Sequence, residues 1–229
     1  VSPPSLPVQA QLPGNTISLV STYDLRQHIT DQLQKLLPSD VEPLVEDQET
    51  KISELLRQTY GLNAFAKLDG EKLNTSYGLI GAEQHLKRSP NDTLEQHGQF
   101  LQEGMAPGLG AWGYINDPEK EKYYVAVQTL YLPDWELRLN YLRDWYKYRK
   151  VAVVNPNNGK IVIAVIGDAG PARWTGKHFG GSPEIMAYLN LNWGKQKGPV
   201  VMFFVDDPDD KIPLGPLEYN LLKGPPLLS

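Results

Sequence analysis

The chain contains no cysteine, which excludes disulfide bonds and thiolate chemistry. This absence leaves the cellular compartment open, because many exported bacterial proteins of this size do without disulfides. The chain also lacks a run of about 18 apolar residues, the length that a membrane-spanning helix needs. Its longest apolar stretch, residues 151–166, is interrupted by Asn-Pro-Asn-Asn-Gly. We therefore expect no membrane-spanning helix.

Positive charge is also scarce. The chain has 22 Lys and Arg against 27 Asp and Glu, and its formal net charge is -5 at pH 7. The densest basic cluster is the short segment 146–150. A nucleic-acid-binding protein normally presents a basic stripe or patch, so we expect no nucleic-acid partner.

The 229 residues are 41% hydrophobic, enough for one large domain or two small ones with a real core. The chain begins without Met, and residues 1–14, VSPPSLPVQAQLPG, read as a semi-rigid Pro-rich tether. A signal peptide or anchor removed upstream would leave such a start, and the boundary of an excised piece explains it equally well. We expect an exported protein, extracellular or tethered at the periphery of the cell envelope.

Residues 15–104 have the pattern of a small helical and hairpin domain. Leucine and isoleucine at helical spacing predict one helix over 22–37 and a second over 47–60. Residues 63–80 alternate around Asp69-Gly70, a sequence typical of a hairpin turn. A third helix is expected over 93–103.

The character of the chain changes after residue 104. Short β-branched and aromatic segments predict strands in GAWGYI, YYVAVQTLYL, KVAVVNP, KIVIAVIG and GPVVMFFV. A helical insertion is expected at 133–149, and a short helix at 182–189 with Ser182 as its N-cap. We therefore expect an α+β protein with a β domain at 105–206 and a Pro/Asp-rich surface tail at 207–229.

The segment KIVIAVIGDAGP, residues 160–171, places a single carboxylate, Asp168, at the end of an apolar strand in a Gly-flanked turn. Apolar neighbours disfavour the ionised form of a carboxyl group, and the absence of side chains at Gly167 and Gly170 leaves room for a bulky polymer. Such a group suits general acid catalysis. The alternative is an ordinary turn aspartate, because Asp and Gly are common where a strand reverses.

The order of these elements resembles that of the double-psi β-barrel proteins of the rare-lipoprotein-A-like, MltA-like and expansin superfamily. The resemblance covers residues 106–206. Its closest agreement is a strand ending in Asn, an "NGK" turn, an apolar strand running into "D-x-G-P", and a short helix beginning at a Ser. The matching residues are Asn155, Asn158, Gly159, Lys160, Asp168, Gly170, Pro171 and Ser182. The resemblance implies a six-stranded double-psi β-barrel.

The resemblance also implies a bacterial cell-wall enzyme that acts on peptidoglycan or another glycan and needs no cofactor. In the lytic transglycosylases of this superfamily the Asp of the D-x-G turn is the only catalytic carboxylate, and Asp168 occupies that place. Hydrolysis by contrast normally needs a second carboxylate. Expansins and related endoglucanases carry an acid in an "HFD" segment, whereas this chain reads His178-Phe179-Gly180. A barrel that binds glycan without cutting it is therefore the alternative function.

Glu83 is the candidate for a second carboxylate or for a polar group that orients the substrate at the wall of the cleft. Candidate substrate-binding side chains are aromatic groups that stack on sugar rings and polar groups that contact acetamido or carboxylate groups: Trp112, Tyr114, Trp174, Lys177, His178 and His85. Core packing is the alternative for Trp112 and Tyr114, and a solvated turn is the alternative for Lys177 and His178.

A third, less favoured hypothesis is a metal-dependent hydrolase built on Glu83, His85 and His97. The spacing of these residues is nonspecific, and no HExxH helix or other dense ligand motif is present. We therefore expect no metal and no cofactor.

Overall fold

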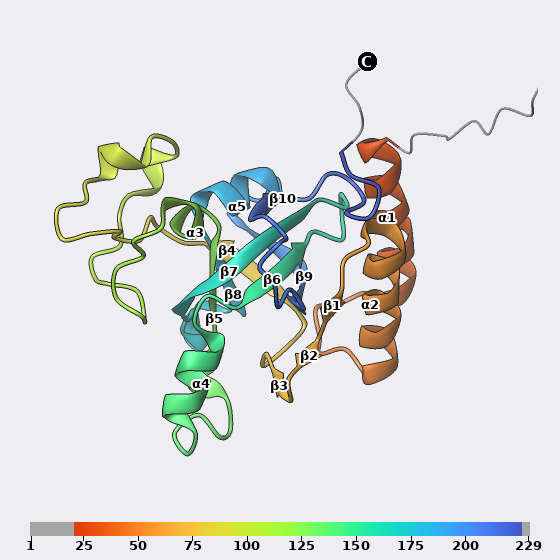
Figure 1. Ribbon diagram of the computed structural model, residues 1–229, viewed down its shortest axis with the longest axis horizontal. Coiled ribbons are helices and arrows are strands. Elements are labelled where there is room, and N and C mark those ends of the chain that lie inside the picture. The colour runs from red at the N-terminus through yellow and green to blue at the C-terminus, as the bar shows by residue number, and fades with distance from the viewer. Residues whose placement is uncertain (1–20, 226–229) are drawn as a thin grey trace, which may run out of the picture.

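A closed barrel of six strands forms the centre of the computed structural model, which describes residues 21–225 (Figure 1). The expected tether at 1–14 lies outside these residues. The barrel strands are β4 (Tyr77–Ala82), β5 (Tyr124–Val127), β6 (Lys150–Val154), β7 (Ile161–Ala169), β8 (Phe179–Gly181) and β9 (Lys197–Val205).

The strands pair in the order β9, β4, β8, β5, β7 and β6, and the pairing of β6 with β9 closes the circle. Two of the six pairs, β4 with β8 and β5 with β7, are parallel, and the other four are antiparallel. Short outer strands extend the sheet: β1 (Ala64–Phe65) pairs with β9, and β10 (Gly215–Pro216) pairs with β7. The fold is thus α+β with a closed mixed barrel.

Strand β7 is apolar at almost every position because both of its faces are covered. Val162, Ala164 and Ile166 belong to the cluster inside the barrel. Ile161 and Ile163 belong to a second cluster outside it. A strand buried on both faces loses the alternation of polar and apolar residues that marks a half-exposed strand.

The second cluster is formed by helices α1 (Thr22–Leu36) and α2 (Glu46–Tyr60), which pack side by side against one side of the barrel (Figure 1). Ser21 caps α1 by accepting from the N–H of Asp24, whose side chain accepts in return from the N–H of Ser21. Gly61 ends α2 with a φ of 66°. Both predicted helices are confirmed.

Two further predicted helices are present as α4 (Leu139–Tyr146), within the expected insertion, and α5 (Pro183–Tyr188), which Ser182 caps. The helix α3 (Pro118–Lys122) was not predicted. No helix within residues 21–225 combines the length and the apolar character that crossing a membrane requires.

The helix expected over 93–103 is wrong. The segment forms two 3₁₀ turns, η1 (Leu94–His97) and η2 (Leu101–Glu103). Gly98 with a φ of 76° and Phe100 with a φ of 53° lie between them, and residues in this region of φ interrupt an α-helix.

The turn at Asp69-Gly70 is correct, but the hairpin around it is short. Its arms are β2 (Lys67–Leu68) and β3 (Glu71–Lys72), and the flanking residues pair elsewhere as β1 and β4. The strand predicted in GAWGYI is wrong, because that segment contains only an isolated bridge between Gly110 and Gly113. The barrel takes β4 as a strand in place of GAWGYI. Strand β4 lies on the N-terminal side of the domain boundary that was expected at residue 104.

Candidate functional site

Asp168 lies near the end of β7, on the outer face of the barrel. Its Oδ1 accepts hydrogen bonds from the N–H of Ala111 over 2.7 Å and from its neighbour Ala169 over 2.8 Å. Among the described residues its other oxygen, Oδ2, has no hydrogen-bond partner. The carboxyl group is therefore held through one oxygen, and the other is free to exchange a proton with a bound molecule.

Burial raises the pKa of the Asp168 carboxyl above its ordinary value, although the N–H groups of Ala111 and Ala169 act in the opposite direction. The side chain is half-buried and forms no salt bridge with any residue of the described part, 21–225. A carboxyl group in this environment keeps its proton to a higher pH than an exposed aspartate, as a general acid must.

Small residues lie beside Asp168 across two neighbouring strands. Ala126 of β5 pairs with Asp168 on one side and with Gly180 of β8 on the other. Gly180 in turn pairs with Gly81 of β4. Residues in register point to the same face of a sheet, so this row, which we call the floor, faces the outside of the barrel. Ala126, Gly180 and Gly81 are buried there, and the side chain of Lys177 lies against Gly81.

Glu83 closes the far end of this row. A Cβ atom added to Gly180 would collide with Cγ, Cδ and Oε1 of Glu83, which shows that the Glu83 side chain lies against Gly180. The N–H of Glu83 donates to Gly181 O over 2.9 Å. One strand, β5, lies between Asp168 and Gly180, and two strand spacings correspond to about 10 Å between their Cα atoms.

Lys177 lies beside Glu83. Its Nζ donates to Ala82 O over 2.9 Å and is 3.8 Å from Glu83 Oε1. Burial raises the pKa of Glu83, the charge of Lys177 lowers it, and the charge of Asp168 adds to the rise. The two carboxyl groups that were predicted from the sequence therefore influence each other electrostatically.

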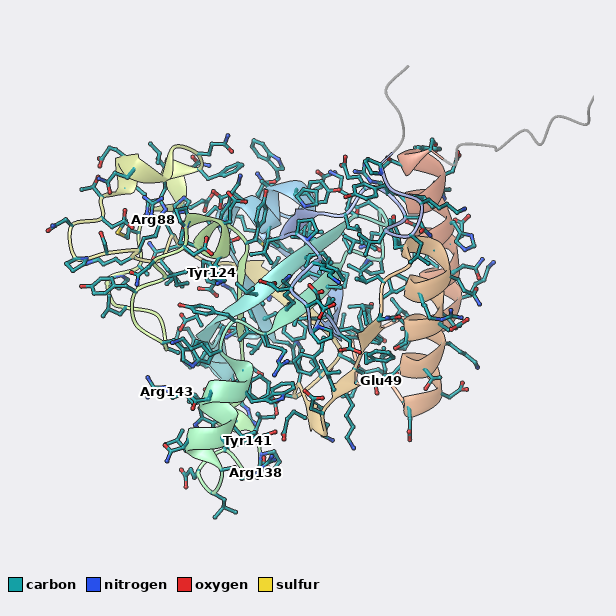
Figure 2. The ribbon with its side chains drawn as sticks, in the orientation of Figure 1. Glu49, Arg88, Tyr124, Arg138, Tyr141 and Arg143 are labelled. Carbon is teal, nitrogen blue, oxygen red and sulfur yellow. The ribbon has the colours of Figure 1, made fainter. Side chains whose placement is uncertain are left out.

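The predicted aromatic residues have different environments. Trp174, on the turn η4 (Arg173–Thr175), is 89% exposed. Trp112 is half-buried, packs against the barrel cluster and donates from Nε1 to the carbonyl of Arg143 over 2.9 Å. This bond ties the GAWGY segment to α4, where Arg143 is labelled in Figure 2. Tyr114 is half-buried.

The two predicted histidines make internal contacts. His178 accepts from the N–H of Leu79 at Nδ1 over 3.0 Å, and its ring packs against Gly78. Burial, with a contribution from the charge of Lys197, lowers the pKa of His178, so the ring is neutral near pH 7. The side chain of His85 has no exposed surface, so it does not contribute to the floor between Asp168 and Gly180.

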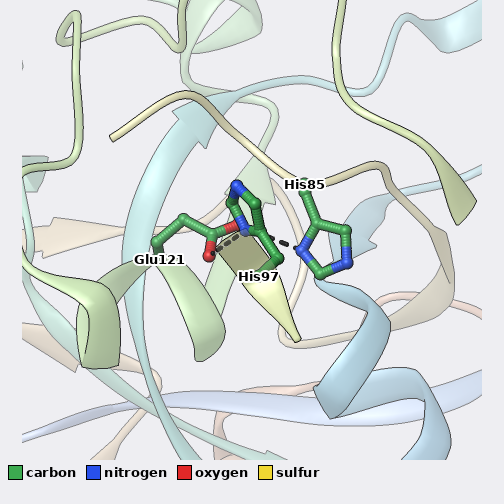
Figure 3. Close-up of side chains that lie close together, drawn as sticks. All are labelled: His85, His97 and Glu121. Atoms are coloured by element: carbon green, nitrogen blue, oxygen red, sulfur yellow. Dashed lines mark hydrogen bonds and ion pairs between the residues drawn. The ribbon is translucent and has the colours of Figure 1, made fainter. Parts of the chain in front are cut away.

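The structure brings His85 and His97 together but not with Glu83. Their third partner is Glu121 of α3 (Figure 3). Sequence reasoning missed Glu121, and it missed the Ala111 N–H that holds Asp168. A backbone donor has no sequence signature, and the lone Glu121 carries none that relates it to histidines 24 and 36 residues away.

No protein-family model matches the chain, and no curated protein matches it in sequence.

Proposed function

We propose that this protein binds a cell-wall glycan, a polymer chain of peptidoglycan, along the outer face between Asp168 and Glu83. We further propose that it cleaves the glycan by the route of lytic transglycosylases. The observation that carries the proposal is the Asp168 carboxyl group, which is fixed through Oδ1, free at Oδ2 and raised in pKa.

The proposed reaction needs one carboxyl group. Protonated Asp168 donates its proton to the glycosidic oxygen as the bond from that oxygen to the anomeric carbon breaks. The resulting carboxylate then takes the proton of the C6 hydroxyl of the same muramic-acid residue, whose oxygen attacks the anomeric carbon and closes a 1,6-anhydro ring. Asp168 ends protonated, as it began, and no water is consumed.

The architecture supports this proposal. The barrel contains two parallel strand pairs, an arrangement compatible with the double-psi type, and we propose that it is one. Asp168 lies at the end of β7, where the matched superfamily pattern has its catalytic acid. The pattern's short helix beginning at a Ser is present as α5, capped by Ser182.

Glu83 supplies an acid where the expansin pattern has one. The expected "HFD" acid would stand at position 180, which is glycine, and the Glu83 side chain lies over that glycine. We propose that Glu83 orients the sugar across the floor from Asp168. The cell envelope is then the place where the protein acts, since its substrate is found there.

The direct test is incubation of the purified protein with peptidoglycan sacculi, followed by mass spectrometry of the released fragments. Anhydro-muropeptides are expected from the wild type. Asp168→Asn keeps the oxygen that accepts from Ala111, so it should fold and bind while losing turnover. Asp144→Asn, at an exposed position on α4, is the matched control and should cleave normally. Fragments with simple reducing ends, or full activity of Asp168→Asn, would contradict the proposed mechanism.

A second candidate function is glycan binding without cleavage, which the exposed ring of Trp174 favours. Aromatic faces in solvent stack on sugar rings and need no catalytic acid. Sedimentation of the protein with sacculi in the absence of any product would support this function. Trp174→Ala should then weaken sedimentation, whereas Asp168→Asn should not.

A further inference from the structure

A buried cluster of two histidines and a glutamate lies in the segment that wraps the outer face of the barrel. His85 follows β4, His97 ends η1 and Glu121 lies on α3 (Figure 3). One ligand atom from each can be chosen so that all three lie within 4.8 Å of one another. The exposed fractions of the three side chains are 0%, 1% and 4%.

Hydrogen bonds fix which nitrogen of each ring carries a proton. His85 Nε2 is 3.1 Å from Gln99 O, and a carbonyl oxygen only accepts, so this nitrogen donates. His97 Nε2 is 3.1 Å from Asp92 Oδ2, and Asp92 is held as a carboxylate by the paired hydrogen bonds of Arg88. His97 Nε2 therefore donates as well.

Both Nδ1 atoms face Glu121. His85 Nδ1 is 3.4 Å from Oε1, and His97 Nδ1 is 3.0 Å from Oε2. A nitrogen lone pair facing a carboxylate is repulsive unless a positive charge lies between them. Without a metal ion, a proton carried by the ring or by Glu121 must lie in each of these contacts, within a buried cluster whose ring centroids are 4.5 Å apart.

A divalent cation supplies the same two positive charges at one point and leaves both rings neutral. The pattern of outer hydrogen bonds is the one that metal-binding histidines show, in which the second ring nitrogen donates to a carboxylate or a backbone carbonyl. Ligand atoms of a tetrahedral zinc ion with these donors are about 3.3 Å apart. The two contacts of Glu121 are close to this spacing but run to different oxygens, and one ligand atom from each residue gives a set spread over as much as 4.8 Å, so the cluster contracts on binding.

A further carboxyl group interacts with the cluster. Glu184 of α5 is buried, and its Oε2 has no hydrogen-bond partner among the described residues. The charge of Glu184 acts on His85, and those of His85 and Glu121 act on Glu184. Burial raises the pKa of Glu184 to about 7, and a cation in the cluster would favour its ionised form.

We propose that His85 Nδ1, His97 Nδ1 and the Glu121 carboxylate bind a zinc-class divalent cation. Two imidazoles and a carboxylate select zinc over magnesium and calcium, which prefer oxygen ligands throughout. The burial of the cluster makes the site structural: it joins β4, η1 and α3, and so holds the segment that carries both Glu83 and Ala111. The proposal goes beyond the glycan activity and is tested without glycan.

The experiment is zinc titration of the chelator-treated full chain by calorimetry, with thermal melting in parallel. One equivalent of zinc should bind. The melting temperature should rise by about 5 to 10 °C when the free zinc concentration is about 100 times the dissociation constant. Magnesium at the same concentration should leave melting unchanged. His97→Ala should abolish binding, and Asp92→Asn, which keeps all three ligands, should weaken it by about 10-fold or more.

His28→Ala is the matched control, because His28 is exposed on α1, and it should bind zinc as the wild type does. X-ray absorption at the zinc edge of the wild-type protein does not depend on any variant folding, and it should show two imidazole ligands. Unchanged zinc binding by a folded His97→Ala variant, absence of zinc binding by the wild type, or a spectrum without imidazole would each overturn the proposal.

Discussion

The side chain of Glu83 lies across the backbone of Gly180, and its carboxyl group fills the space in which a side chain at position 180 would stand. Gly180 lies on β8, and Glu83 directly follows the parallel strand β4, whose Gly81 pairs with Gly180. The acid at this point of the barrel therefore comes from a distant part of the chain. This relationship makes the role of Glu83 testable without changing Glu83 itself.

Gly180→Ala should reduce turnover of sacculi by about 10-fold or more, because small displacements of a group that positions substrate are costly. The φ of Gly180 is outside the left-handed region, so alanine fits the backbone and the flexible Glu83 side chain must move instead. Gly108→Ala is the matched control, because a Cβ there meets nothing within 4 Å. Rates of anhydro-muropeptide release measure the effect, and equal rates for both variants would show that the position of Glu83 is unimportant.

The raised pKa of Asp168 predicts a pH-dependent difference in stability between the wild type and Asp168→Asn. An acid whose pKa is higher in the folded protein binds its proton more tightly there than in the unfolded chain. This contribution to stability is full below the ordinary Asp value of 3.8 and is lost as the pH rises through the raised pKa. Asparagine does not titrate in this range.

The wild type should therefore lose stability relative to Asp168→Asn as the pH rises from about 4. Urea denaturation of both proteins at several pH values in this range gives the free energies of unfolding. Buffer effects common to both proteins cancel in the difference. A difference that stays constant, or that moves in favour of the wild type with rising pH, would contradict the raised pKa.

Local signals in the sequence predicted the local features of the fold. The two amphipathic helices, the Asp69-Gly70 turn and the apolar run that delivers Asp168 each depend on nearby residues, and all three are found where expected. Most of strand β4 was expected as an arm of the hairpin over 63–80, but its place in the barrel was missed. Its partners, β8 and β9, lie far downstream, so only the closed barrel reveals it.

Part of the candidate site was also predicted from the sequence. Asp168 and Glu83 are on the same face of the barrel, and the charge of the first acts on the second. The histidines at 85 and 97 do meet, but their partner is Glu121 rather than Glu83. Which carboxylate reaches them depends on the path of the long segment between β4 and β5, and residue spacing does not encode that path.

Asp207→Asn should lower the free energy of unfolding by about 2 to 4 kcal/mol, because it breaks a largely buried ion pair. Asp207 Oδ2 is 2.7 Å from Lys150 Nζ, and the Asp207 side chain is 6% exposed. Burial opposes ionisation, but the hydrogen bonds from Lys150 and from the N–H groups of Ile212 and Lys211 outweigh it and lower the pKa of Asp207.

The lowered pKa fixes the sign of the pH dependence. The stabilisation by Asp207 is present above its ordinary value of 3.8 and is lost as the pH falls through the lower folded value. Asp209→Asn is the control, because its pair with Lys211 is exposed and should contribute less than about 1 kcal/mol. Urea denaturation near neutral pH compares the two variants, and equal losses would show that burial adds nothing to the Lys150 pair.

Gly159→Ala should destabilise the protein more than Gly194→Ala, although the two glycines have nearly the same φ, 66° and 62°. Both substitutions force alanine into the left-handed region, which costs about 1 to 2 kcal/mol. At Gly194 a Cβ meets nothing within 4 Å, whereas at Gly159 it would overlap the backbone carbonyl of Arg26 in α1. The backbone at Arg26 cannot rotate aside as a side chain can, so α1 must move away from the turn between β6 and β7. The additional loss should be about 1 to 3 kcal/mol in the free energy of unfolding, measured by urea denaturation. Equal losses for the two variants would mean that α1 is not packed against this turn.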